Sequence, residues 1–169
     1  MDQLEWYCPK RFTRHYELRR GGVSIATLTY DPAPAVQWEY TSRHPATVRT
    51  DEAQWRLTTV RRGFLGLKAA VQVDGTISGR LEAGYLLLRG TLSIGEAPRY
   101  RWKGSLWELG EDLFTHVEGF PVMRLSAGNY FDRIHTRASV LTDATPALDV
   151  VLLASVGLYV RFLMNKSYR

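Results

Sequence analysis

The segment near the C-terminus constrains the fold of this chain more than any other. Residues 150–160 carry no charge and are apolar on nearly every side of a helix, between Asp149 and Arg161. Pro146 suits the first position of such a helix, which we expect over about 146–164. A helix without a polar face either spans a membrane or lies at the centre of a hydrophobic core.

The length of the uncharged stretch favours the core. At 1.5 Å per residue it spans roughly 16 Å, about half the hydrocarbon thickness of a bilayer. Basic residues flank it on both sides, so the asymmetry that orients membrane helices is missing. We therefore expect a buried core helix, with a C-terminal membrane tail anchor as the alternative.

The chain before residue 141 has the pattern of a β-protein. Apolar and polar residues alternate over 55–59 and 69–73, which is typical of half-buried strands. Turn residues separate these runs: Asp74-Gly75 predicts a type I′ hairpin, and Gly21-Gly22 joins two further strands. Ten or more short strands fit at the spacing of a sandwich or a barrel.

Three segments together resemble the tubby C-terminal-like superfamily, which includes LURP-one-related proteins and phospholipid scramblases. They are the hairpin units YELRRGGVSIATL (16–28) and LWELGEDLFTHVEG (106–119), and the terminal VVLLASVGLYVRFLM (150–164). The resemblance implies a mainly β fold: a closed antiparallel barrel of about twelve strands around a central hydrophobic C-terminal helix. It also implies one domain over 1–169.

Composition narrows the class of protein further. The chain has 169 residues, a net charge of +5 and one cysteine, Cys8, so an internal disulfide framework is excluded. The start lacks the basic and apolar regions of a secretory signal, and we expect a cytoplasmic protein, peripheral at a membrane if it binds lipid. The basic excess is spread along the chain without a basic tail, which argues against nucleic-acid binding.

No catalytic or cofactor-binding motif is present. The four histidines, His15, His44, His116 and His135, lie far apart and show no metal-ligand spacing. No serine stands in a nucleophile elbow, and no glycine-rich loop has the spacing of a nucleotide site. We expect a protein that is not an enzyme and that holds no metal or cofactor.

The candidate binding residues are arginines at glycine turns. Of the 22 basic residues 18 are Arg, and Arg19-Arg20 and Arg61-Arg62 each directly precede glycine. Guanidinium groups bind phosphate bidentately, and turn N–H groups add donors. A second basic segment, residues 99–103 (RYRWK), alternates charged with aromatic residues. Alternation predicts a basic outer face over a buried aromatic face.

These features lead to several hypotheses about function. The first is a non-enzymatic module that binds anionic phospholipid head groups, or a partner protein, through Arg19, Arg20, Arg61 and Arg62. The resemblance supports it, because tubby-type domains bind phosphoinositide head groups through basic side chains. The cysteine cluster and calcium segment of scramblases are absent from this sequence. The alternatives are a β-domain tethered by a tail anchor, and a lipocalin-like carrier whose helix packs outside the barrel.

Overall fold

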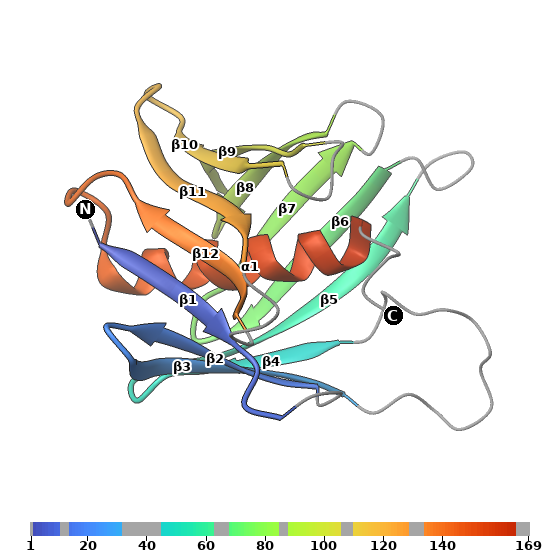
Figure 1. The fold of residues 1–169 in the computed structure, drawn as a ribbon. Coiled ribbons are helices and arrows are strands. Elements are labelled where there is room, and N and C mark those ends of the chain that lie inside the picture. The colour runs from blue at the N-terminus through green and yellow to red at the C-terminus, as the bar shows by residue number, and fades with distance from the viewer. Residues whose placement is uncertain are drawn as a thin grey trace.

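A computed structural model describes residues 2–10, 14–31, 45–62, 68–84, 88–105, 110–128 and 134–164, apart from the side chains of 60–62, 68, 69, 135 and 164. It contains twelve strands and one helix (Figure 1): β1 (Gln3–Tyr7), β2 (His15–Arg20), β3 (Val23–Tyr30), β4 (Ala46–Arg49), β5 (Gln54–Arg62), β6 (Lys68–Gly75), β7 (Gly79–Gly84), β8 (Arg89–Ile94), β9 (Ala97–Lys103), β10 (Asp112–His116), β11 (Pro121–Ala127), β12 (Ile134–Val140) and α1 (Ala147–Met164).

The strands form one closed antiparallel barrel. Each strand pairs with its neighbours in sequence, and β1 closes the ring by pairing with β12. Closure leaves no open sheet edge. The twelve-stranded barrel with a C-terminal helix predicted from the sequence is therefore confirmed.

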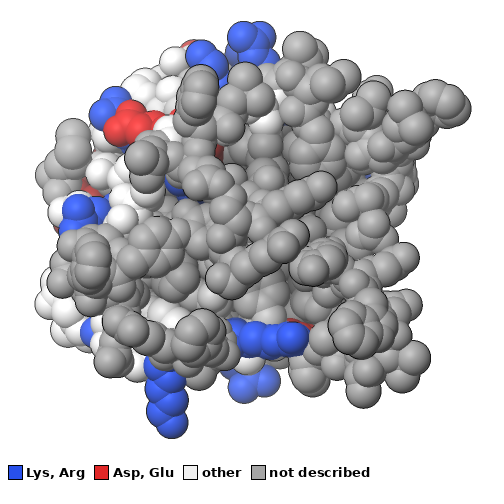
Figure 2. All heavy atoms as spheres, turned by 45° about the vertical axis from the view of Figure 1, so that its right-hand side comes forward, with Lys and Arg blue, Asp and Glu red and all other residues white. Residues whose placement is uncertain are grey.

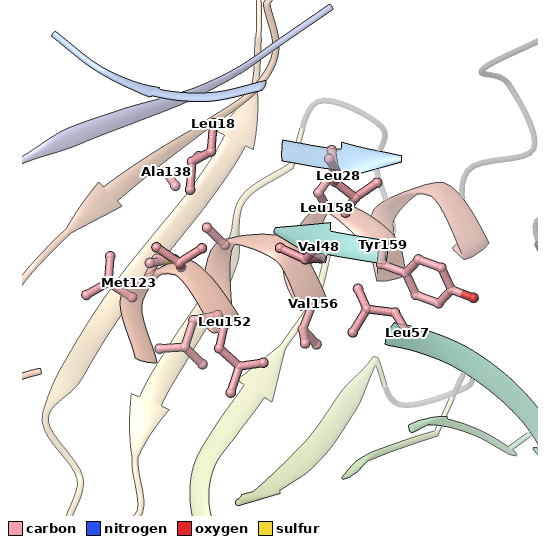
Figure 3. Packing of buried hydrophobic residues seen from close by; sticks show 14 of the residues in the cluster. Leu18, Leu28, Val48, Leu57, Met123, Ala138, Leu152, Val156, Leu158 and Tyr159 are labelled. Carbon is pink, nitrogen blue, oxygen red and sulfur yellow. The ribbon is translucent and has the colours of Figure 1, made fainter. Parts of the chain in front are cut away.

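The helix α1 occupies the interior of the barrel (Figure 1). Every residue from 150 to 161 is buried, and Leu152, Leu153 and Val156 are fully inaccessible. Figure 3 shows helix side chains among those of the surrounding strands, with Tyr159 near Leu57 of β5 and Leu152 near Met123 of β11. The predicted burial of residues 150–160 is confirmed, and the helix begins at Ala147, one residue after Pro146.

Small residues and hydrogen bonds fit the helix to its surroundings. A Cβ atom at Gly157 would lie 2.8 Å from the Leu125 side chain and 3.2 Å from Phe114, so only glycine lets α1 approach β10 and β11 this closely. The indole Nε1 of Trp6 donates to the carbonyl of Ala154 at 3.0 Å, in the middle of the helix.

The barrel has two different ends, which we name by their connections. At the turn end, short connections join β2 to β3, β4 to β5, β6 to β7, β8 to β9 and β10 to β11, and α1 begins there. At the loop end, α1 ends, and most of the connections contain residues outside the described set.

The turns correct one detail of the sequence analysis. Gly21 and Gly22 both have positive φ (56° and 84°), as a type I′ turn requires. The type I′ turn predicted at Asp74-Gly75 is wrong, although a hairpin does form there. Pairing with β5 continues through Gly75, and the chain reverses only over residues 76–78.

Among the described residues, no helix combines the length and the apolar character that a membrane crossing requires.

Candidate anion-binding surface

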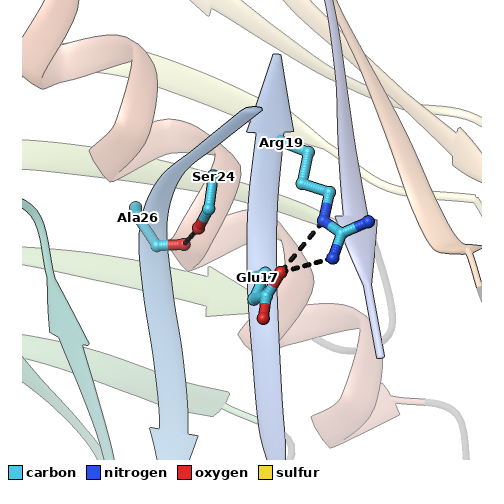
Figure 4. Close-up of polar contacts among 4 residues, drawn as sticks. All are labelled: Glu17, Arg19, Ser24 and Ala26. Carbon is cyan, nitrogen blue, oxygen red and sulfur yellow. Dashed lines mark hydrogen bonds and ion pairs between the residues drawn. The ribbon is translucent and has the colours of Figure 1, made fainter. Parts of the chain in front are cut away.

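Arg19 and Arg20, two of the predicted phosphate ligands, lie on β2 at the turn end. The Nε and Nη2 atoms of Arg19 both donate to one carboxylate oxygen of Glu17, at 2.9 and 2.7 Å (Figure 4). The guanidinium carbon also lies 3.6 Å from the centre of the Tyr7 ring. Arg20 lies 3.5 Å from the carboxylate of Asp2. Both cations therefore have an acidic partner within the protein.

Arg61 and Arg62, the other two predicted ligands, lie at the opposite end of the barrel. They form the last two positions of β5, and their side chains are outside the described set. Since β5 starts at the turn end and finishes at the loop end, the length of a strand separates this pair from Arg20. The four arginines do not lie together at one site.

The basic segment on β9 has the two faces that alternation predicts. Tyr100 and Trp102 are buried at 2% exposure, whereas Arg99, Arg101 and Lys103 are exposed. Arg99 lies 3.5 Å from the Asp149 carboxylate. Arg101 and Lys103 form no ion pair with any described residue.

Strand register extends this basic face across the sheet. Lys103 of β9 stands directly opposite Arg89 of β8, which pairs with Gly84 of β7. Gly84 pairs with Lys68 of β6, and Lys68 pairs with Arg62 of β5. We call Arg62, Lys68, Arg89 and Lys103 the basic row; it crosses five strands over about 19 Å.

The two members of the basic row whose side chains are described, Arg89 and Lys103, lack a compensating charge among the described residues. Arg89 is exposed, and it too forms no ion pair with a described residue. Two acids lie one step from the row, and each faces another arginine. Glu82, opposite Thr91, has its carboxylate 3.2 Å from Arg80. Glu111, two residues before the Leu113 that pairs with Lys103, lies 3.4 Å from Arg124. Like charges directly opposite each other destabilise a sheet. An arrangement that opposes Arg89 to Lys103 is stabilised when an anion lies between them.

Figure 2, turned by 45° so that the right-hand side of Figure 1 comes forward, shows described side chains mainly at its left, top and bottom. Among them Lys and Arg (blue) predominate over Asp and Glu (red).

The two histidines whose side chains are described, His15 and His116, lie at opposite ends of the barrel. His15 Nδ1 lies 3.0 Å from the Thr29 hydroxyl at the loop end, whereas the His116 ring stacks on Phe120 at the turn end. His44 and the side chain of His135 lie outside the described residues. Within the described part of the chain, no group of three or more His, Cys, Asp or Glu residues could hold a metal ion.

Two buried carboxylates hold the ends of the helix. At the turn end, the Tyr100 hydroxyl donates to Asp149 at 2.6 Å, and burial, followed by this bond, raises the pKa of Tyr100. At the loop end, Arg161 Nη1 donates to Asp112 at 3.0 Å and to the Gly110 carbonyl at 3.1 Å. The Asp112 and Arg161 side chains are only 6% and 7% exposed. These ionisable groups serve the packing of α1.

The buried carboxylate of Asp112 makes stability depend on pH. Burial raises its pKa, while Arg161 and the Ser105 N–H oppose that shift. A carboxyl with a raised pKa binds its proton more tightly in the folded state, so its contribution is largest at low pH and is lost as the pH rises through the folded pKa.

We therefore expect wild type to gain stability relative to Asp112→Asn as the pH falls from 7 to about 4. Urea unfolding of both proteins at each pH measures this difference. A difference that instead grows as the pH rises would show that the Arg161 pair lowers the pKa of Asp112 below its ordinary value.

Comparison with known proteins returns no match: no family model, curated protein or solved structure is similar to this chain. The likeness to the tubby-like superfamily thus rests on the order of elements and the central helix, and it stays a prediction.

Proposed function

We propose that this barrel is a non-enzymatic binding module that docks on anionic phospholipid head groups through the basic row. The observation that carries the proposal is Arg89 facing Lys103 across β8 and β9 without a carboxylate partner among the described residues. Of the four arginines predicted from the sequence, Arg62 belongs to this row by register.

The chemistry of the row suits phosphate groups on a surface. Arg supplies a planar fork that binds two phosphate oxygens, and Lys supplies a compact charge. Each basic residue near an anionic membrane contributes about 1 kcal/mol. With Arg101 two residues from Lys103 on β9, the exposed cations can contact several head groups at once, and salt should weaken the contact.

The arrangement of the interior bears on the alternatives. A lipocalin-like carrier needs an open lumen and a helix outside the barrel, whereas α1 is buried inside it. A tail anchor needs residues 150–160 in the bilayer, where the hydrogen bond from Trp6 to the Ala154 carbonyl and the close approach of Gly157 to Phe114 and Leu125 would be lost. A protein partner would have to present acidic groups to the same basic row.

The test is co-sedimentation with vesicles of phosphatidylcholine containing phosphatidylserine, at low salt. We expect the double variant Arg89→Ala/Lys103→Ala to bind about 30-fold more weakly than wild type, from two contacts of about 1 kcal/mol each. The matched control is Arg20→Ala/Arg49→Ala, which removes the same charge from exposed residues at the turn end. We expect this control to bind nearly as wild type does.

Two outcomes would contradict the proposal. An equal loss in both double variants would mean that only net charge matters. Absence of wild-type binding at low salt would exclude the lipid surface and leave an acidic protein as the class of partner to test.

A further inference from the structure

The outer faces of β8 and β9 bring three cations and one hydroxyl group together. Arg89 stands directly opposite Lys103, and Thr91 stands directly opposite Arg101, two residues farther from that pair on each strand. All four side chains are exposed. Directly opposite Cβ atoms lie about 5 Å apart, and alternate residues of one strand lie about 7 Å apart. The four side chains therefore surround one small area of the sheet.

The surroundings of this area supply little negative charge. The residues that flank it in register on β7 and β10 are Gly84, Glu82, Leu113 and Thr115. Glu82 stands beside Thr91, and its carboxylate lies 3.2 Å from Arg80. The next outward residue along β9 is Arg99, which lies 3.5 Å from Asp149. Among the described residues, the three cations thus have no acidic partner of their own.

The backbone holds the end of this strand pair in place. Leu88 has a φ of 47°, in the left-handed region that is unfavourable for residues other than glycine. Its carbonyl accepts the Gly104 N–H at 2.7 Å, one residue beyond the pair of Arg89 and Lys103. A Cβ atom at Gly104 would lie 2.5 Å from the Trp102 ring, so this position requires glycine. Strained backbone of this kind is found often at binding sites, and here it keeps two like charges side by side.

A phosphomonoester suits these donors better than a phosphodiester does. The phosphate of a monoester has three free oxygens and a charge of about −1.5 to −2 at pH 7. Two guanidinium groups, one ammonium group and one hydroxyl group can donate to all three oxygens at once. A diester has only two free oxygens and a single negative charge, so it leaves more of the positive charge uncompensated.

We propose that Arg89, Thr91, Arg101 and Lys103 form one discrete site for the terminal phosphate of a phosphomonoester. This inference rests on the proposed function and names the head group that the barrel prefers. That group is a terminal phosphate, as in phosphatidic acid, rather than the diester phosphate of phosphatidylserine. A soluble phosphomonoester offers the same chemistry, so the two sources are tested separately.

Thermal unfolding in methyl phosphate and in dimethyl phosphate tests the site without a membrane. Sodium chloride keeps the ionic strength constant, and the pH is about 8, above the second pKa of phosphomonoesters. A ligand that binds only the folded protein raises the midpoint of unfolding. We expect the apparent affinity for methyl phosphate to be at least about tenfold higher, the contribution of one more charge-assisted hydrogen bond.

Two variants show whether the selectivity belongs to the site. Lys103→Gln should abolish most of it. Because this change also removes the like charge opposite Arg89, the variant without ligand should be at least as stable as wild type. The control Arg49→Gln removes an exposed cation from β4 and should retain the selectivity.

Co-sedimentation with phosphatidylcholine vesicles measures the same preference at a membrane. One set of vesicles contains phosphatidic acid, and the other contains enough phosphatidylserine to give the same surface charge. We expect wild type to bind the phosphatidic acid vesicles more tightly by about the same factor, and Lys103→Gln to bind both sets equally.

The outcomes separate this inference from the proposed function. Equal effects of the two soluble phosphates, including none, or selectivity retained by Lys103→Gln, would overturn the discrete site, while binding to both sets of vesicles would leave the proposed function intact. Selectivity for methyl phosphate without binding to either set would refute the proposed function and assign the site to a soluble phosphomonoester. Selectivity in solution with equal binding to both sets would overturn the head-group preference.

Discussion

The variant Leu153→Asp is expected to be unfolded or aggregated under conditions in which wild type is folded. Leu153 is fully buried in the middle of α1. The change removes about 1.5–3 kcal/mol of apolar burial and places an unpaired carboxylate in the core, which adds several kcal/mol. The sum is comparable to the whole net stability of a typical domain, about 5–15 kcal/mol. Circular dichroism and size-exclusion chromatography measure the outcome.

A matched control and a truncation make the result specific to the helix. Val23→Asp introduces the same charge at a position that is 67% exposed, and we expect it to change stability by less than about 0.5 kcal/mol. A chain ending at Thr142 lacks the whole core helix and should also fail to fold. A monomeric 1–142 chain with cooperative unfolding and an unchanged β spectrum would show that the barrel does not depend on α1.

Arg161→Met is expected to lower the free energy of unfolding by about 3–5 kcal/mol, because it leaves the Asp112 carboxylate buried without its cation. Met retains much of the apolar length of the side chain, so the loss reports mainly on the charge. Urea unfolding at pH 7 measures it.

The double variant Arg161→Met/Asp112→Asn separates the ion pair from the packing. Asn can still accept the Ser105 N–H bond that Asp112 accepts at 3.1 Å, and it carries no charge. Replacing both members of a buried pair with neutral groups costs much less than breaking it, so the double variant should recover at least about half of the loss. If the loss of unfolding free energy in the double variant equals the sum of the losses in Arg161→Met and Asp112→Asn, the two residues do not interact.

At the two ends of the helix, the sequence indicates which residues carry charge but not which residues they contact. Asp149 in the first turn of α1 and Arg161 in its last turn have the signs that stabilise the helix dipole, and their positions in the chain alone show this. Their actual partners, Tyr100 and Asp112, come from β9 and β10, each 49 residues away. No local pattern indicates which strand lies beside a given turn of the helix.

In the candidate site, too, local features are predictable from the sequence and contacts between strands are not. Alternation in residues 99–103 predicted the exposed Arg101 and Lys103 correctly, because the side-chain period of a strand is a local property. Arg89 and Lys68 gave no signal of their own, since each is an isolated cation in its segment. The pairs Arg19-Arg20 and Arg61-Arg62 look alike in sequence, yet they lie at opposite ends of the barrel.

Elements with local causes can be predicted from the amino-acid sequence: the alternating strands, the glycine turn at Gly21-Gly22, and a helix whose apolar surface requires cover on every side. Which charged residues lie near one another depends on the folded barrel. Register between strands places Arg62, Lys68, Arg89 and Lys103 in one row, and chain direction places Arg20 and Arg62 at opposite ends of the barrel. Register depends on the packing of all twelve strands around α1, and a shift of one residue would turn every side chain of a strand to the other face.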